Sequence, residues 1–314
     1  MPKTPNRPSV IVNTANKNEK PRMYVLMCAI MFVWGFDYVV VKNALYELDP
    51  LTLIFFKYLL ALFLVLVIRL KTEKGPLFKK KDIGLFIVCA IFGDILYHFS
   101  EYTAMSYMQV SLITIILCFV PVMSIAIERV MYKRRTSAKV VIGAFVCIFG
   151  VALIIGIDWD ILLRGRLIGY LLAFACVALW NTYNFITAAL HERYTTITLT
   201  LNQLICTCLL LCPYVLFNIE KLPEFTPVLI GRLLYLGLAS AGAGFLIQVR
   251  SLLVLGPTVS ALFSNFLPVT TTFFGWLFLG EIIAPIQFVG GAIVVAAGFY
   301  VIREKGKQPK TLRK

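Results

Sequence analysis

The sequence is poor in charge and almost free of histidine. Only 15% of its 314 residues are charged and only two are histidine, whereas 60% are hydrophobic. Soluble globular proteins carry about 25% charged and about 45–50% apolar residues. The chain therefore has more apolar surface than a water-soluble fold can bury, and we expect much of that surface to face lipid.

Several motifs of other function classes are also missing. No P-loop is present, which excludes an ATP-driven pump in a single chain. No acidic cluster of the D-x-x-x-D type is present, as a transferase acting on prenyl or phospholipid substrates with Mg²⁺ would need. The eight cysteines lie inside apolar runs without histidine partners at metal spacing, so we interpret them as packing residues. We expect no cofactor, no metal and no enzymatic activity.

Long apolar runs dominate what is there. A helix of about 20 apolar residues crosses a bilayer core of about 30 Å, and a helix satisfies its own backbone hydrogen bonds in lipid. The expected spans cover residues 23–41, 51–70, 83–101, 108–127, 140–157, 167–189, 197–217, 229–249, 258–279 and 286–302. The sequence therefore predicts an all-α integral membrane protein with ten transmembrane helices.

The basic residues are distributed unevenly between the expected loops. With the N-terminus inside, 24 of the 30 Lys and Arg residues fall in inside segments and 5 in outside segments, while Lys57 lies within a span. Cytoplasmic loops are rich in Lys and Arg. We therefore expect a multi-pass protein of the cell membrane, with a bacterial inner membrane favoured by the short loops. Residues 1–22 are expected to form a disordered cytoplasmic N-terminus and residues 304–314 a basic cytoplasmic tail.

The same distribution bears on partners. The net charge of +14 sits in loops and at the termini, so we expect contact with the lipid bilayer and not with nucleic acid. The sequence does not indicate an oligomeric state.

The chain also resembles itself at a spacing of about 147 residues. Pro121, within Phe-Val-Pro-Val, recurs as Pro268 within Phe-Leu-Pro-Val, and at a spacing one residue shorter Trp34 meets Trp180. A proline within an apolar run is costly in a helix, so its recurrence at the same place indicates a repeat.

This repeat divides the chain into two halves of five spans, residues 23–157 and 167–303. Because five is odd, the second half enters the membrane from the opposite side, which makes an inverted repeat. Inverted repeats are typical of secondary transporters, since two such halves can pack in two ways, each open to one side. A channel and a duplicated scaffold without a transport role are the alternatives.

A series of motifs runs in order through both halves: Trp34-Gly35-Phe36, Lys42 and Pro50, then Glu101-Tyr102-Thr103-Ala104 and Pro121, and later Pro257, Ser260, Pro268, Gly280-Glu281, Gly290-Gly291 and Gly298. Together they resemble the EamA-like proteins of the drug/metabolite transporter superfamily, over about residues 23–303. The resemblance implies a ten-helix fold of two inverted repeats around a central cavity. It also implies export or exchange of small metabolites, such as amino acids or amphiphilic compounds.

The sequence departs from that family pattern in three places. Lys57 stands where the family often has Arg, and Lys lacks the planar fork of a guanidinium. Glu281 of the second half is met by Arg134 in the first, which weakens a role that needs Glu in both halves. Asp94 and His98 do not belong to the pattern and indicate a subgroup.

Ionisable side chains inside spans are functional candidates because lipid disfavours them strongly. Asp37 and Lys57 lie in the first two spans, and Asp94, His98 and Glu101 share one face of the third by their spacing. Lys57 would hold a carboxylate or pair with an acid, while an acid would meet an amino group or carry a proton as the coupling ion. A structural ion pair between helices is the alternative.

Amides and aromatic rings complete the candidate set. The predicted substrate-binding residues are Trp34, Asp37, Lys57, Asp94, His98, Glu101, Trp180, Asn181, Asn184, Gln203 and Gln248, with helix kinks at Pro121 and Pro268. The amides can orient a ligand or join helices to one another. The sequence therefore predicts a secondary transporter of small molecules, with a membrane enzyme or scaffold acting on lipid-like molecules as the alternative.

Overall fold

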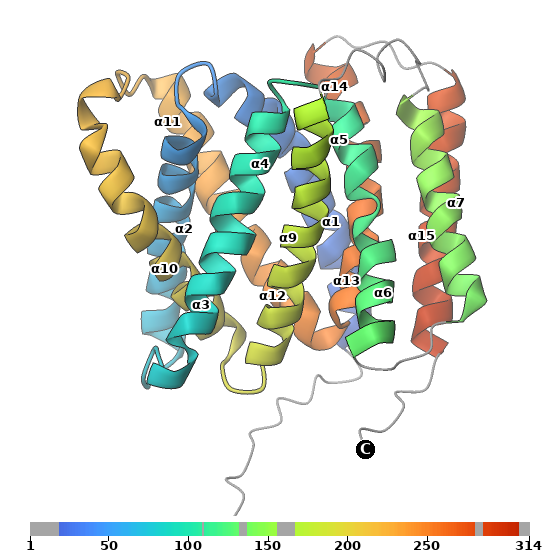
Figure 1. Ribbon diagram of the computed structural model, residues 1–314, viewed down its shortest axis with the longest axis horizontal. Helices are drawn as coiled ribbons and strands as arrows, with labels where there is room; N and C mark the ends of the chain where they lie inside the picture. The colour runs from blue at the N-terminus through green and yellow to red at the C-terminus, as the bar shows by residue number, and fades with distance from the viewer. Residues whose placement is uncertain (1–18, 109, 132–136, 156–166, 280–284, 308–314) are drawn as a thin grey trace, which may run out of the picture.

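Helices form every regular element of the computed structural model within the residues that it describes (Figure 1). Those residues are 19–108, 110–131, 137–155, 167–279 and 285–307. The elements are α1 (Glu19–Ala44), α2 (Pro50–Thr72), η1 (Lys80–Asp82), α3 (Ile83–Cys89), η2 (Ala90–Leu96), α4 (Tyr97–Ala104), α5 (Val110–Leu117), α6 (Val120–Met131), α7 (Ala138–Ile155), α9 (Leu167–Leu190), α10 (Thr196–Phe217), η3 (Ile219–Lys221), α11 (Pro227–Leu234), η4 (Tyr235–Ala243), α12 (Gly244–Val254), α13 (Pro257–Leu262), η5 (Phe263–Phe266), α14 (Leu267–Leu279) and α15 (Pro285–Lys307).

Seven helical stretches are long and apolar enough to cross a membrane. They are Glu19–Ala44, Pro50–Thr72, Lys80–Ala104, Leu167–Leu190, Thr196–Phe217, Pro227–Val254 and Pro257–Phe278. Ala138–Gly150 and Phe288–Val301 are shorter apolar helices. The all-helical membrane class is therefore confirmed, while a total of ten crossings stays a prediction.

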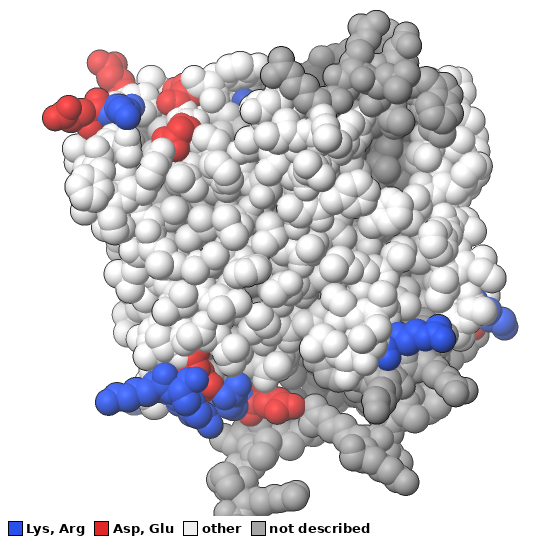
Figure 2. All heavy atoms as spheres, in the orientation of Figure 1, with Lys and Arg blue, Asp and Glu red and all other residues white. Residues whose placement is uncertain are grey.

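The face shown in Figure 2 carries a broad band without charge between two charged ends. Large apolar side chains such as Phe63, Phe149 and Leu171 are exposed on the molecule. Such a contiguous apolar surface is unfavourable in water and suits contact with the hydrocarbon core of a bilayer. Lys and Arg gather along the end that contains the connection between α2 and α3, and we call this end the basic end (Figures 1 and 2).

Helices from the first and second parts of the chain interleave. α1 packs against α12 and α14, α2 against α10 and η4, and α4 against α9. α7 and α15 pack against each other at one edge of the molecule (Figure 1). Because of this interleaving, the side chains of α1, α2 and α4 meet those of α9 and α12 at the centre.

Two of the long stretches contain π-helical segments, η2 and η4. A π-helix has a wider turn than an α-helix and occurs in short pieces, frequently at functional sites. Within η2, Gly93 lies against the ring of Tyr183 in α9, and within η4, Gly237 lies against Leu60 in α2. The glycines let these wide turns approach the neighbouring helices closely.

The ends of the chain differ from the expectation in detail. α1 begins at Glu19, so the expected disorder of residues 1–22 does not hold for residues 19–22, and residues 1–18 lie outside the described part. Glu19 accepts hydrogen bonds from Arg250 Nε and Nη2 at 2.7 and 2.9 Å. This pairing, together with a negative charge in the first turn of the helix, favours the earlier start. α15 ends at Lys307, so it includes the first four residues of the expected tail, and residues 308–314 lie outside the described part.

The contact at Gly93 leads to a stability prediction. A Cβ atom at Gly93 would overlap the Tyr183 ring, whereas one at Gly84 would meet nothing within 4 Å. Gly93→Ala should lower the free energy of unfolding by about 1–3 kcal/mol, the usual cost of overpacking. Gly84→Ala should be neutral or slightly stabilising, because Ala is the better helix former. Thermal unfolding of both variants in detergent checks this, and a Gly93→Ala protein as stable as the parent would contradict it.

Candidate functional site

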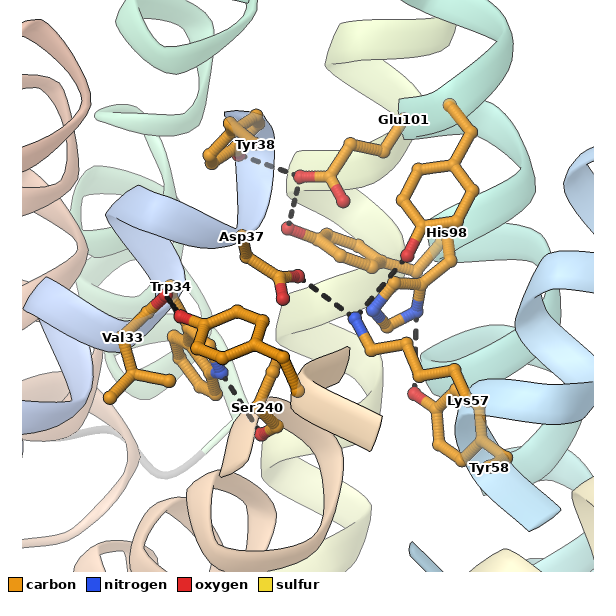
Figure 3. Close-up of polar contacts among 12 residues, drawn as sticks. Val33, Trp34, Asp37, Tyr38, Lys57, Tyr58, His98, Glu101 and Ser240 are labelled. Atoms are coloured by element: carbon orange, nitrogen blue, oxygen red, sulfur yellow. Dashed lines mark hydrogen bonds and ion pairs between the residues drawn. The ribbon is translucent and has the colours of Figure 1, made fainter. Parts of the chain in front are cut away.

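An ion pair lies at the centre of the bundle. Lys57 Nζ of α2 is 3.0 Å from Asp37 Oδ2 of α1, and it also donates to Tyr102 Oη at 3.3 Å (Figure 3). Lys57 is 1% exposed and Asp37 8% exposed. A lysine this far from water must have a partner, since an uncompensated charge in a protein interior is very costly. The structure therefore brings together two of the predicted residues.

Glu101 lies near this pair on α4. Its Oε1 accepts hydrogen bonds from Tyr38 Oη at 2.7 Å and from Tyr97 Oη at 3.1 Å. Tyr38 follows Asp37 on α1, so the same turn of that helix supplies a partner for Lys57 and a partner for Glu101 (Figure 3). Glu101 is therefore held by neutral donors, and no Lys or Arg of the described residues forms an ion pair with it.

Asp94 has a different set of partners. Its carboxylate accepts from Tyr58 Oη of α2 at 3.2 Å and from Thr207 Oγ1 of α10 at 2.5 Å. His98 Nδ1 is 2.9 Å from the Asp94 carbonyl oxygen. Because a carbonyl oxygen only accepts, Nδ1 carries the proton in this contact. Asp94 thus joins α2, η2 and α10, and His98 lies between it and the cavity described next.

A cavity of about 50 Å³ is bordered by the ion pair, Glu101 and His98. Apart from Ser264, its other walls are aromatic and apolar. Trp34 of α1 and Trp180 of α9 meet edge to face with centroids 5.9 Å apart, and Tyr97 lies 5.0 Å from Trp180. The lining includes six of the predicted residues: Trp34, Asp37, Lys57, His98, Glu101 and Trp180.

The four predicted amides are buried but do not border this cavity. Gln248 Nε2 donates to Asn184 Oδ1 at 3.0 Å, which joins α12 to α9. Gln203 Nε2 donates to Thr187 Oγ1 at 2.8 Å, which joins α10 to α9. Asn181 Nδ2 donates to the carbonyls of Val177 and Val120, and its Oδ1 accepts from Ser124. Their contacts in the structure are those of side chains that hold helices together.

Both predicted kink prolines lie at helix starts. Pro121 is the second residue of α6, after a two-residue turn that ends α5, and Pro268 is the second residue of α14, after η5. A proline in the first helical turn removes no helix hydrogen bond. Leu117 and Val120 from the first break border the cavity, as do Ser264 and Leu267 from the second.

Sequence reasoning missed the tyrosines that hold the charged groups. Tyr38, Tyr58, Tyr97 and Tyr102 each bond one of the ionisable residues. Their signal was present, because Tyr38 adjoins Asp37, and Tyr97 and Tyr102 flank His98 and Glu101 on one helix. A tyrosine in a membrane span has a polar hydroxyl that needs a partner when buried, so such neighbours are candidates.

Comparison with known proteins bears on this site. The sequence model of the EamA-like transporter family matches residues 21–156 and again residues 167–303. The chain belongs to the EamA-like transporter family. Two similar proteins are an uncharacterized transporter of Archaeoglobus fulgidus, 22% identical over 90% of this chain and 99% of the relative, and the uncharacterized transporter YoaV of Bacillus subtilis, 22% identical over 87% and 94%.

A solved crystal structure shares the fold of this EamA-like protein. Its TM-score is 0.71 at 15% identity, and the similarity covers 89% of this chain and 98% of the other. At this identity the likeness concerns the fold alone. The family membership identifies the protein as a membrane protein of a transporter family, and the cavity lies where helices from both family matches meet.

The ion pair leads to a prediction about stability. Lys57→Met leaves Asp37 as an uncompensated buried charge and should lower the free energy of unfolding by about 3–5 kcal/mol. Asp37→Asn in the same background removes that charge, so the double variant should recover part of the loss. A double-mutant cycle of unfolding in detergent measures the coupling. Strictly additive effects would show that the two groups do not depend on each other.

Proposed function

We propose that this protein is a secondary transporter that moves a small metabolite across the cell membrane by alternating access. The observation that carries the proposal is the central cavity, with a buried ion pair and a second carboxylate between helices of both halves. Membrane interiors disfavour such groups strongly, and they usually mark substrate or ion pathways. Transport gives these side chains a role that a purely apolar scaffold would not need.

Several features support two inverted repeats. α1 and α9, the first helices of the two halves, run in opposite directions (Figure 1). The π-segments η2 and η4 occupy corresponding places in the two halves, and so do the helix breaks before Pro121 and Pro268. The family model matches the chain twice. We therefore propose ten crossings in two five-helix halves, residues 23–157 and 167–303.

Polar contacts join the two halves at the basic end. Asp82, before α3, pairs with Arg193, after α9, and Glu19 pairs with Arg250 at 2.7 Å. Partly exposed ion pairs of this kind are weak in water and can break when this end opens.

The opposite end has its own contacts between the halves. Glu47, between α1 and α2, pairs with Arg232 of α11 at 2.5 Å, and Tyr214 of α10 donates to Asp49 at 3.1 Å. Alternating access requires each end to separate in turn while the other holds. Reversible polar contacts at both ends, in place of a continuous apolar seam, suit that requirement.

The size of the cavity indicates that the halves must move for a substrate to enter. About 50 Å³ has room for only a few water molecules, and a solute with a larger apolar body needs more space. Loading of such a solute would therefore widen the site. The space for the solute would form if the helices between the cavity and one end of the bundle moved apart.

The orientation follows from charge. We propose that the basic end faces the cytoplasm, because cytoplasmic loops carry the excess of Lys and Arg, and that both termini lie on that side. A bacterial inner membrane is the proposed location, and export or exchange the proposed mode. A proton carried by a cavity carboxylate is the proposed coupling ion.

Counterflow in liposomes tests the function. Reconstituted protein should exchange a labelled solute from a panel of amino acids and other small metabolites in a saturable manner. Lys57→Ala should reduce the rate to less than about a tenth, because Asp37 loses its partner within the site. Lys42→Ala removes the same side chain from the exposed end of α1 and serves as the matched control, with an unchanged rate expected.

An inward or outward pH gradient should change net accumulation of the solute, and Glu101→Gln should abolish this effect at saturating solute. Absence of exchange across the panel, from protein shown to be folded, would contradict a transport role. Exchange that a pH gradient does not affect would contradict proton coupling and leave the proposed transport function supported.

A further inference from the structure

The cavity holds more acid than base. Of the described residues that border it, Asp37 and Glu101 are carboxylic acids, and Lys57 is the one ammonium. The Lys57 charge is matched by Asp37 at 3.0 Å, which leaves Glu101 without a cationic partner. The site therefore has one acidic group more than its own side chains neutralise.

Two carboxylate oxygens also lack donors. Asp37 Oδ2 holds Lys57, while Asp37 Oδ1 is buried and has no hydrogen-bond partner. Both tyrosine hydroxyls near Glu101 donate to Oε1, and no donor among the described residues reaches Oε2. Asp37 Oδ1 is thus a buried acceptor without a donor, which is unfavourable, so a ligand that brings an N–H group to this oxygen would be stabilised there.

An anionic ligand would meet the opposite situation. Lys57 already gives two of its three N–H donors to Asp37 and Tyr102. A carboxylate that took over Lys57 would displace Asp37 and leave both of its oxygens unpaired. It would also lie near Glu101, whose charge would repel it in a site of low dielectric constant.

The walls suit a cation with an apolar body. Trp180 lies at the centre of a group of rings, with Trp34, Tyr97 and Phe245 at centroid distances of 5.9, 5.0 and 6.1 Å. Aromatic faces attract cations through the ring quadrupole, with Trp the strongest. Their area also accepts hydrocarbon removed from water.

From these contacts we infer that the cavity binds a small organic cation, with an ammonium or guanidinium group between Asp37 and Glu101 and an apolar body against Trp34 and Trp180. The inference rests on the proposed transport function and names the chemistry of the solute. It requires the site to widen around the ligand, as loading by any metabolite would.

Three probes of matched shape test the inference. 2-Phenylethylammonium, 2-phenylethanol and 3-phenylpropanoate share the ring and the two-carbon chain and differ in the charge of the head group. Calorimetric titration of the purified full chain in detergent at pH 7 measures their binding. The ammonium should bind at least about tenfold more tightly than the alcohol, because a hydrogen bond between charged groups is stronger than one from a neutral hydroxyl by about that factor in affinity. The carboxylate should bind most weakly.

Variants connect the preference to the two acids. Glu101→Gln should weaken binding of the ammonium probe at least about tenfold and leave the alcohol within about threefold, because the amide keeps the shape and loses the charge. Asp37→Asn should act in the same direction. Glu224→Gln removes an exposed carboxylate from the segment before α11, outside the cavity, and should leave all three affinities unchanged. If Asp37→Asn does not fold, the comparison of probes on the parent and Glu101→Gln still decides.

Equal or tighter binding of the alcohol or the carboxylate would overturn the inference, and so would absence of binding by the ammonium to folded protein. These results are distinct from failure of transport. Counterflow of an anionic solute without ammonium binding would support the transport function and contradict the cation site. If the ammonium probe binds but no solute shows counterflow, including the bound amine itself, the cation site is supported and the transport role is contradicted.

Discussion

The charge of Lys57 is the constraint on which the centre of the molecule depends. An ammonium group in the middle of a membrane span cannot stay unpaired, because neither lipid nor a packed interior solvates it. Asp37 forms an ion pair with it at 3.0 Å, and the Tyr102 hydroxyl is a second acceptor at 3.3 Å. These contacts fix α1, α2 and α4 relative to one another. Tyr38, His98 and Glu101, which also border the cavity, lie on two of these helices.

The frame also separates three acids that share the bundle interior. Asp37 is paired with Lys57, Glu101 is held by two tyrosine hydroxyls, and Asp94 lies between Tyr58 and Thr207. Each acid thus has a distinct environment, set by which helix faces it. A transporter needs such differences, because groups that bind solute, carry protons and hold helices together cannot all respond in the same way.

The sequence predicted the helical membrane class and the central acids and lysine for a simple reason. The cost of placing charge or an unpaired backbone in lipid leaves few arrangements, so long apolar runs must be helices and Lys57 must find Asp37 or Glu101. The amides could not be assigned this way. Asn184 and Gln248 are neutral, and lipid tolerates them either against a ligand or between helices, so their mutual bond at 3.0 Å depended on rotations of α9 and α12 that spacing does not give.

Asp94 shows a second limit of spacing. Its spacing predicted a helix face shared with His98 and Glu101, yet it does not border the cavity that they line. Seven residues of a helix extend about 10 Å along the axis, so Asp94 and Glu101 meet different neighbours. The π-segment η2, which contains Asp94, was also not expected, because no periodicity in this apolar run distinguishes a wide turn from an α-helical one. Tyr38, Tyr97 and Tyr102 were missed because tyrosine counts as apolar in a hydropathy pattern.

Alternating access requires the two ends of the bundle to separate in turn around the cavity. Spin labels at Lys81 and Glu192 would report the basic end, and labels at Tyr46 and Glu220 the opposite end, with distances measured by pulsed electron resonance in liposomes. Alternating access predicts two populations in which one distance lengthens while the other shortens, with their ratio changed by transported solute. A single fixed distance at both ends, unchanged by a solute that the protein exchanges, would contradict alternating access.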